Sequence, residues 1–141
     1  MSKLTWKVSR PLSDKHQIKK LEEILGVTMP DDYIECVMKN NAGYPSLKRF
    51  ITDTGNERIF NNLLTFDESK GVNVFNTYES VFNASGSKEL FPFAEDPFGN
   101  YICFDFSESS VKIVYWEHET QKTETVCTTF TEFLAKLGPT E

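Results

Sequence analysis

The second half of the chain contains three short runs of apolar residues that restrict the folds open to it. The runs span residues 90–94, 101–106 and 111–116, and only brief turn-forming segments separate them. Connections this short suit antiparallel strands. A fourth β-like run follows at residues 124–128. The sequence therefore predicts a mostly antiparallel sheet over this half of the chain.

Helical patterns lie on both sides of these runs. Residues 13–26 carry apolar side chains at helical spacing, with Ser13 as the expected N-cap and Gly26 as the expected C-terminal stop. Similar spacing of apolar residues predicts three further helices, at residues 29–41, 72–83 and 130–137.

The segment between the second and third predicted helices has the pattern of a hairpin. Residues 47–51 and 59–66 are β-like runs, and the turn-forming residues 52–56 separate them. A length of 141 residues suits one domain with one core. These elements predict an α+β fold, a single domain over residues 1–141 with a mostly antiparallel sheet flanked by N-terminal and C-terminal helices.

The charge of the chain is negative and unevenly distributed. Residues 1–30 hold six Lys or Arg and three Asp or Glu, a sum of +3, whereas residues 31–141 hold nine and eighteen, a sum of −9. An acidic body is repelled by phosphate backbones and attracted to basic proteins, which disfavours direct binding of nucleic acid. No run approaches the roughly 18 apolar residues of a membrane span, and residues 1–6 lack the apolar region of a secretory signal. We therefore expect a cytoplasmic protein without a membrane partner.

The residues that usually perform catalysis or bind metal are sparse. Cys36, Cys103 and Cys127 are far apart in the sequence, so we expect reduced, buried thiols rather than disulfides. No Cys lies within four residues of another Cys or of His16 or His118, which argues against zinc. No glycine-rich loop between a strand and a helix matches a phosphate-binding motif. The sequence predicts no catalytic residues, no metal site, no cofactor and no enzyme activity.

Acidic residues gather in and beside the three central runs. Residues 88–119 hold seven acids and two lysines, a local sum of −5. Three interpretations are open: a solvated face, a binding surface for a protein, and a magnesium site for phosphoryl chemistry. For two residues of the binding-surface hypothesis, a purely structural role is the alternative to partner contact. Asp105 would cap amides of the neighbouring turn, and Trp116 would pack in the core. The binding-surface hypothesis comprises Glu95, Asp96, Phe98, Asp105, Tyr115, Trp116, Glu117 and Glu119.

Four segments, in order along the chain, resemble the motifs of the SUKH superfamily. The most distinctive is a strand, turn and strand in which the apolar-Pro-apolar-Ala run at residues 91–94 leads through Gly99 and Asn100 to a strand that ends at Asp105. The other matching segments are residues 25–33 with 40–45, residues 114–119 and residues 130–134. Together they span nearly the whole chain, and residues 46–88 carry no recognised motif.

This resemblance implies a SUKH-like fold and the function of an immunity protein. Such a protein is a cytosolic inhibitor that binds a secreted bacterial polymorphic toxin, often a nuclease, in a stoichiometric complex. Nucleases hold phosphates on positive surfaces, so an inhibitor succeeds by presenting carboxylates to them. The expected partner is a cognate protein toxin, and the chain itself is expected to be a monomer or a weak homodimer. The superfamily also includes proteins that bind signalling enzymes, so an intracellular regulatory or scaffold module is the alternative.

Overall fold

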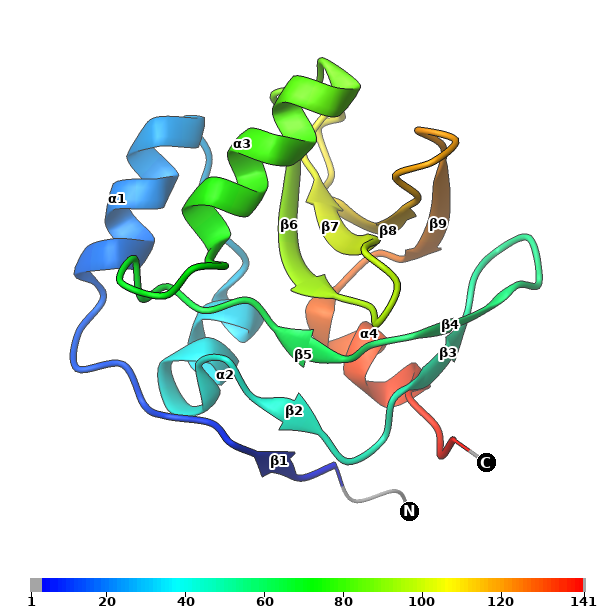
Figure 1. The fold of residues 1–141 in the computed structure, drawn as a ribbon, viewed down its shortest axis with the longest axis horizontal. Helices are drawn as coiled ribbons and strands as arrows, with labels where there is room; N and C mark the ends of the chain where they lie inside the picture. Colours follow the sequence, from blue (N-terminus) through cyan, green and yellow to red (C-terminus); the bar gives the residue numbers. More distant parts are fainter. Residues whose placement is uncertain (1–3, 141) are drawn as a thin grey trace.

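A five-stranded antiparallel sheet forms the centre of residues 4–140, the part of the chain that the computed structural model describes (Figure 1). The strand order follows the sequence, so each strand pairs with its neighbours along the chain. The strands are β5 (Asn62–Leu63), β6 (Leu90–Glu95), β7 (Tyr101–Asp105), β8 (Lys112–Trp116) and β9 (Thr123–Cys127).

Helices and two smaller two-stranded sheets complete the described residues. The helices are α1 (His16–Leu25), α2 (Asp31–Asn40), α3 (Val74–Ser85) and α4 (Phe130–Lys136). The small sheets pair β1 (Trp6–Lys7) with β2 (Tyr44–Pro45), and β3 (Arg49–Ile51) with β4 (Glu57–Ile59).

Side-chain hydrogen bonds help to fix the first turns of α3 and α4. The Asn73 side chain accepts hydrogen bonds from the amides of Phe75 and Asn76 at the start of α3, and the Asn76 side chain accepts one from the Asn73 amide in return. Asp32 joins two helices, because its Oδ2 accepts hydrogen bonds from both the amide and the hydroxyl of Thr131, each at 2.8 Å. This pair fixes the start of α4 against α2.

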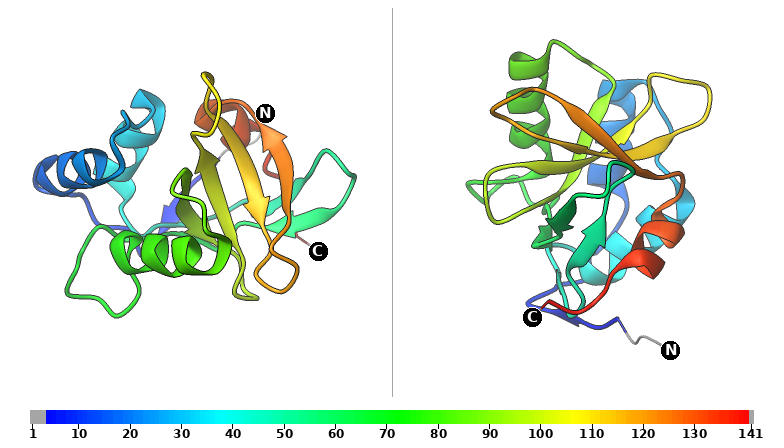
Figure 2. Two further views of the ribbon diagram at one scale, coloured as in Figure 1. Left: turned by 90° about the horizontal axis from the view of Figure 1, so that it is seen from above. Right: turned by 90° about the vertical axis from the view of Figure 1, so that its right-hand side faces the viewer.

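Side chains from both faces of the sheet are buried. Along β7, Ile102 and Phe104 point into the main core, whereas Cys103 joins a smaller cluster with Val81 of α3. Figure 2 shows α3 against one side of the sheet, with α4 on the other. Because both faces are covered, the strands cannot present an exposed polar face along their whole length.

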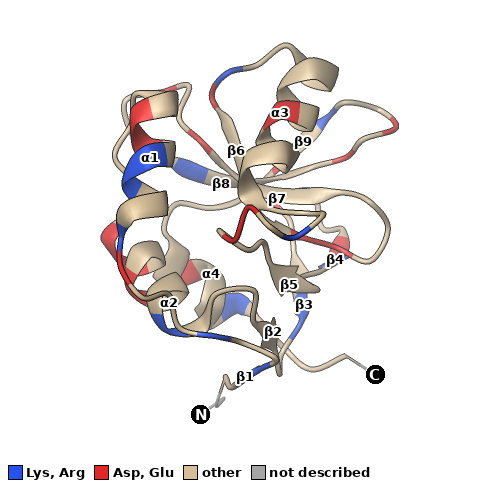
Figure 3. Cartoon of the chain, turned by 60° about the vertical axis from the view of Figure 1, so that its left-hand side comes forward, with Lys and Arg blue, Asp and Glu red and all other residues tan. Residues whose placement is uncertain are grey.

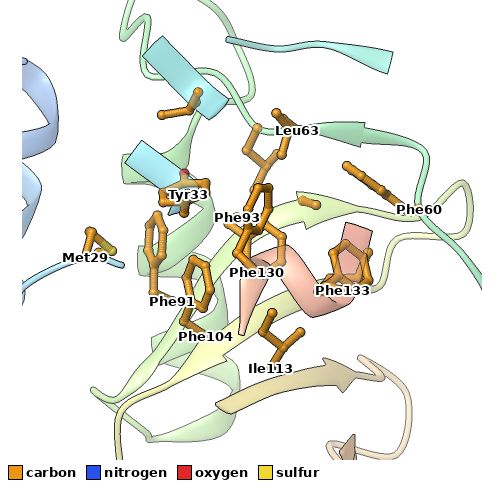
Figure 4. Packing of buried hydrophobic residues seen from close by; sticks show 14 of the residues in the cluster. Met29, Tyr33, Phe60, Leu63, Phe91, Phe93, Phe104, Ile113, Phe130 and Phe133 are labelled. Atoms are coloured by element: carbon orange, nitrogen blue, oxygen red, sulfur yellow. The ribbon is translucent and has the colours of Figure 1, made fainter. Parts of the chain in front are cut away.

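Aromatic rings make up much of the main core (Figure 4). The Phe93 ring stacks on that of Phe104 with centroids 4.4 Å apart, and Phe93 also meets Phe130 and Phe133 edge-on. Tyr33 of α2 contacts the same group, with its ring centroid 5.1 Å from that of Phe104. Edge-to-face arrangements of this kind add to the stabilisation from burial alone.

The Tyr33 hydroxyl is buried in this group and has no hydrogen-bond partner among the described residues. Burial, aided by the negative charge of Cys36 when ionised, raises the pKa of Tyr33 well above its ordinary value. Since an unpartnered buried hydroxyl costs roughly 1–3 kcal/mol, we expect Tyr33→Phe to leave the free energy of unfolding unchanged or to raise it by about 1 kcal/mol. Urea unfolding measures this change. As a control, Tyr115→Phe should lower stability, because the Tyr115 hydroxyl donates a 2.6 Å hydrogen bond to Asp96. A clear loss of stability in Tyr33→Phe would contradict the prediction.

The α+β fold with a mostly antiparallel sheet, predicted from the sequence, is confirmed. The ends of most elements differ from the predictions by one or two residues; for example, the helix predicted at residues 72–83 is α3, Val74–Ser85. Two differences are larger. The first helix begins at His16, with Lys15 in the N-cap position, so Ser13 is not the cap; instead Asp14 Oδ1 accepts a hydrogen bond from the His16 amide. The predicted hairpin partner 59–66 is also corrected, because pairing with β3 ends at Ile59 and residues 62–63 join the central sheet as β5.

All three cysteines are free thiols, as predicted. Cys103 and Cys127 are buried, and Cys36 is half-buried. Burial is the main cause that raises the pKa of Cys36 to about 11 and that of Cys127 to about 12, so both remain protonated at neutral pH. Within residues 4–140 no helix has the length and apolar character needed to cross a membrane.

Candidate functional site

The register of the central sheet brings two turns to the same end of the molecule. Tyr101 pairs with Trp116, so the turn that precedes β7 and the turn that follows β8 emerge beside each other (Figure 2). We call residues 95–100 and 117–122 together the two-turn rim. Five of the residues predicted to contact a partner fall within it, and one of them, Asp96, is buried. The five are Glu95, Asp96, Phe98, Glu117 and Glu119.

A buried carboxylate organises the first turn of the rim. Asp96 is 3% exposed. Its Oδ1 accepts hydrogen bonds from the amides of Phe98 and Asn100, each at 2.8 Å. Its Oδ2 accepts from Asn100 Nδ2 at 3.1 Å and from the Tyr115 hydroxyl at 2.6 Å. Four donors on one carboxylate fix the path of the turn and tie it to β8.

The second turn is held to the first through Asn100. Asn100 Oδ1 accepts a hydrogen bond from the His118 amide at 3.0 Å and lies 2.7 Å from His118 Nδ1. Between these contacts Gly99 has a φ of +86°, a left-handed conformation that glycine adopts without steric cost. The two turns therefore form one connected unit rather than two independent loops.

The surface of the rim combines one exposed aromatic ring with three carboxylates. Phe98 in the first turn is 72% exposed, and Glu119 in the second turn is also exposed. Glu95 and Glu117 are half-buried, and Glu117 Oε1 accepts a 2.7 Å hydrogen bond from the Thr120 hydroxyl. Burial raises the pKa of Glu95 despite a hydrogen bond from Asn62 that lowers it.

Burial corrects the prediction for three of the proposed contact residues. Asp96, Tyr115 and Trp116 are 3%, 2% and 3% exposed, so a partner cannot reach them without rearranging the sheet. The Trp116 ring stacks on that of Tyr101, with centroids 6.3 Å apart, on the face covered by α3. Burial and the bond to Asp96 raise the pKa of Tyr115. These side chains support the rim from below.

Asp105 lies away from the rim and has the capping role considered for it. It is the last residue of β7, and Tyr101 at the other end of the strand adjoins the rim. Its Oδ1 accepts a 2.9 Å hydrogen bond from the Ser107 amide, which stabilises the turn into β8. We leave Asp105 out of the contact surface.

The carboxylates of this region do not converge on a common point. Within residues 4–140 no group of three or more His, Cys, Asp and Glu side chains is placed to hold a metal ion. Asp96, the most central carboxylate, already accepts four hydrogen bonds from the protein. The arrangement can present charge and an apolar ring to a partner.

The β3–β4 hairpin supports the same region through contacts that the sequence did not indicate. Glu124 of β9 accepts hydrogen bonds from Thr54, Asn56 and Arg58. Burial of Glu124 opposes ionisation, but these three bonds together lower its pKa. The Arg58 guanidinium in turn lies 4.5 Å from the centre of the Tyr115 ring. These residues come from distant parts of the chain, so no local pattern points to them.

One family comparison covers most of the chain. A family model named SUKH_6 and described as SMI1-KNR4 cell-wall matches residues 15–134, a range that includes both turns of the rim. A comparison with curated proteins gives no match.

Proposed function

Because the chain belongs to the SUKH family described as SMI1-KNR4 cell-wall, we propose that it is a cytoplasmic immunity protein that binds and neutralises a bacterial toxin. Members of this family commonly act in toxin immunity and are generally not enzymes, although the family name also allows other roles. Inhibition by such a protein is stoichiometric, because it occupies the toxin and converts no substrate.

The observation that carries the proposal is the pre-organised presentation of Phe98. Its side chain is 72% exposed, yet its amide is held by the buried Asp96 carboxylate. A large apolar side chain in water has a cost that docking into a partner would remove. Because the turn is already ordered, binding loses little further conformational entropy. These are the properties of an aromatic anchor at a protein interface.

The charge of the rim supports a basic partner, and a nuclease is the class we propose. The whole chain carries a net charge of −6, and the rim that presents Phe98 also holds Glu95, Glu117 and Glu119 against one lysine, Lys122. Nucleases attract phosphates with positive surfaces, and the same field attracts carboxylates. In this mechanism the glutamates accelerate association, Phe98 slows dissociation, and the bound rim blocks access of nucleic acid to the active site.

Binding kinetics with the toxin test the site. The toxin is recovered with the tagged chain from its native cell and is recognised by its toxicity when expressed without the chain. Reversal of Glu117 and Glu119 to Lys should slow association about tenfold at low salt, because steering depends on these charges. Phe98→Ala should speed dissociation about tenfold or more, which corresponds to roughly 1.4 kcal/mol or more for an anchor residue.

A matched control makes the same change of charge at the other end of the sheet. Glu89 and Glu108 are exposed acids outside the rim, and their reversal to Lys should leave both rates nearly unchanged at moderate salt. Equal effects of the two double variants would reject the rim as the contact site. A partner that is harmless without the chain would reject the immunity function and favour a regulatory module.

A further inference from the structure

A second exposed surface, opposite in charge to the rim, surrounds the β1–β2 pair. It comprises the exposed residues Lys7, Val8, Arg10 and Tyr44 and the half-buried Lys48, whose Nζ donates a 3.1 Å hydrogen bond to the Asn61 carbonyl. We call these five residues the basic face. Val8 is 79% exposed and Tyr44 is 38% exposed. Lys48 Nζ lies 5.5 Å from the centre of the Tyr44 ring. Figure 3 shows basic segments at β1 and at the start of β3.

The backbone holds the Val8 side chain outward. Val8 has a φ of +58°, a left-handed conformation that β-branched residues rarely adopt. The chain is fixed on both sides of it, since Lys7 pairs with Tyr44 and the Arg10 amide donates a 3.1 Å hydrogen bond to the Asn41 carbonyl. An apolar side chain is thus kept in water at a strained position, in the middle of a basic surface.

Within residues 4–140, ion pairs do not neutralise either surface. Among the residues that the structure describes, the ion pairs involve Glu57, Glu68, Glu108 and Glu124 as acids. No ion pair within residues 4–140 involves Lys7, Arg10 or Lys48 of the basic face. Within the same residues, no ion pair involves Glu95, Glu117 or Glu119 of the rim. The rim holds Glu95, Glu117 and Glu119 against one lysine, Lys122, with Arg58 close enough to interact with Glu117. The basic face holds three cations, so the two surfaces have opposite net sign.

We propose that the basic face binds the two-turn rim of a second copy of this chain. Opposite charges face each other in this contact, and the exposed Val8 and Tyr44 side chains meet the exposed Phe98 of the other copy. The contact is a weak one, of the size seen in transient complexes, because each surface consists of a few residues. The contact joins two different surfaces of the protein. Two copies can therefore form a closed two-fold dimer with two such contacts, or successive copies can assemble into short chains.

This inference stands apart from the proposed immunity function, since it concerns the purified chain alone. Where both hold, self-association covers Phe98 and competes with the toxin for the rim. At high protein concentration, the rim of some molecules would then be covered by another copy of the chain.

Sedimentation of the purified chain tests the contact. At about 0.05 M salt and protein concentrations up to about 1 mM, the average mass should rise above the 16.2 kDa of one chain. In about 0.5 M salt it should return to that of the monomer, because salt screens exposed charges. A mass that stays at 16.2 kDa under all these conditions would overturn the proposal.

A charge swap identifies the two surfaces. One variant carries Glu117→Lys and Glu119→Lys in the rim, and the other carries Lys7→Glu and Arg10→Glu in the basic face. Each variant alone should associate at least about tenfold more weakly than the natural chain, since its two surfaces then share one sign. An equimolar mixture should recover association, because each variant supplies the charge that the other lost.

The control variant carries Lys15→Glu and Lys19→Glu, the same change of charge on exposed residues of the α1 region. It should associate like the natural chain. Mixtures that fail to recover association, or a control as weak as the basic-face variant, would overturn the assignment. If a variant does not fold, amide chemical shifts of the natural chain on dilution give the answer: shifts confined to residues outside both surfaces would overturn the proposal.

Discussion

Replacement of Asp96 by alanine is expected to lower the free energy of unfolding by about 3–5 kcal/mol. The change leaves two backbone amides, the Asn100 side chain and the Tyr115 hydroxyl without their shared acceptor. All lie at a buried or half-buried site, so water replaces these bonds poorly. Urea unfolding measures the loss, and the two-turn rim should also exchange its amide hydrogens faster than the rest of the sheet.

Two comparisons isolate the cause of this loss. Asp96→Asn keeps an oxygen for the two amides but places an amino group against Asn100 Nδ2, so we expect a smaller loss of about 1–2 kcal/mol. Asp105→Ala removes a carboxylate that caps one amide in a more exposed turn, and should cost about 1 kcal/mol or less. Equal losses in Asp96→Ala and Asp105→Ala would contradict the central role of Asp96.

Phe93→Ala is expected to cost about 3–5 kcal/mol of stability, the range for removing a fully buried aromatic ring. Phe93 lies at the centre of the main core, where its ring meets those of Phe104, Phe130 and Phe133. These partners come from β7 and α4, so the cavity would open between the sheet and the helix that covers it. Thermal or urea unfolding measures the change.

Phe98→Ala is the matched control, because it removes the same ring only five positions along the chain. Phe98 is 72% exposed, so its loss should change stability by no more than about 0.5 kcal/mol. If Phe98→Ala destabilised the protein as much as Phe93→Ala, the exposed position of Phe98 would be wrong. Because Phe98→Ala is expected to keep nearly the stability of the natural chain, its effect on binding can be measured without a correction for folding.

Short-range patterns in the sequence predicted most of the secondary structure. The antiparallel connections of the central strands were predicted from the brevity of the turns, since a chain reversal within a few residues leaves no other pairing. The order of motifs predicted the family, and the family model covers residues 15–134. Short elements such as β1 and β2 were missed, because two paired residues leave no pattern to read.

The burial of the candidate site could not be read in the same way. Tyr115 and Trp116 are adjacent in β8 and point to opposite faces, so one of them would be exposed on a sheet covered on a single side. Both are buried because the main core covers one face and the cluster that includes Val81 of α3 covers the other. An acid such as Asp96 looks like a surface residue until the donors around it are known.

The longer elements, the direction of the central strands, the acidic balance and the family of this protein all follow from the order of its amino acids, because these properties depend on neighbouring residues. The folded chain was needed to show which acids face water, and to show that Asn100 and His118 join the two turns into one rim. It also revealed the basic face beside β2, which is built from residues far apart in the chain. Exposure and charge at a surface depend on long-range packing, and no local pattern encodes that packing.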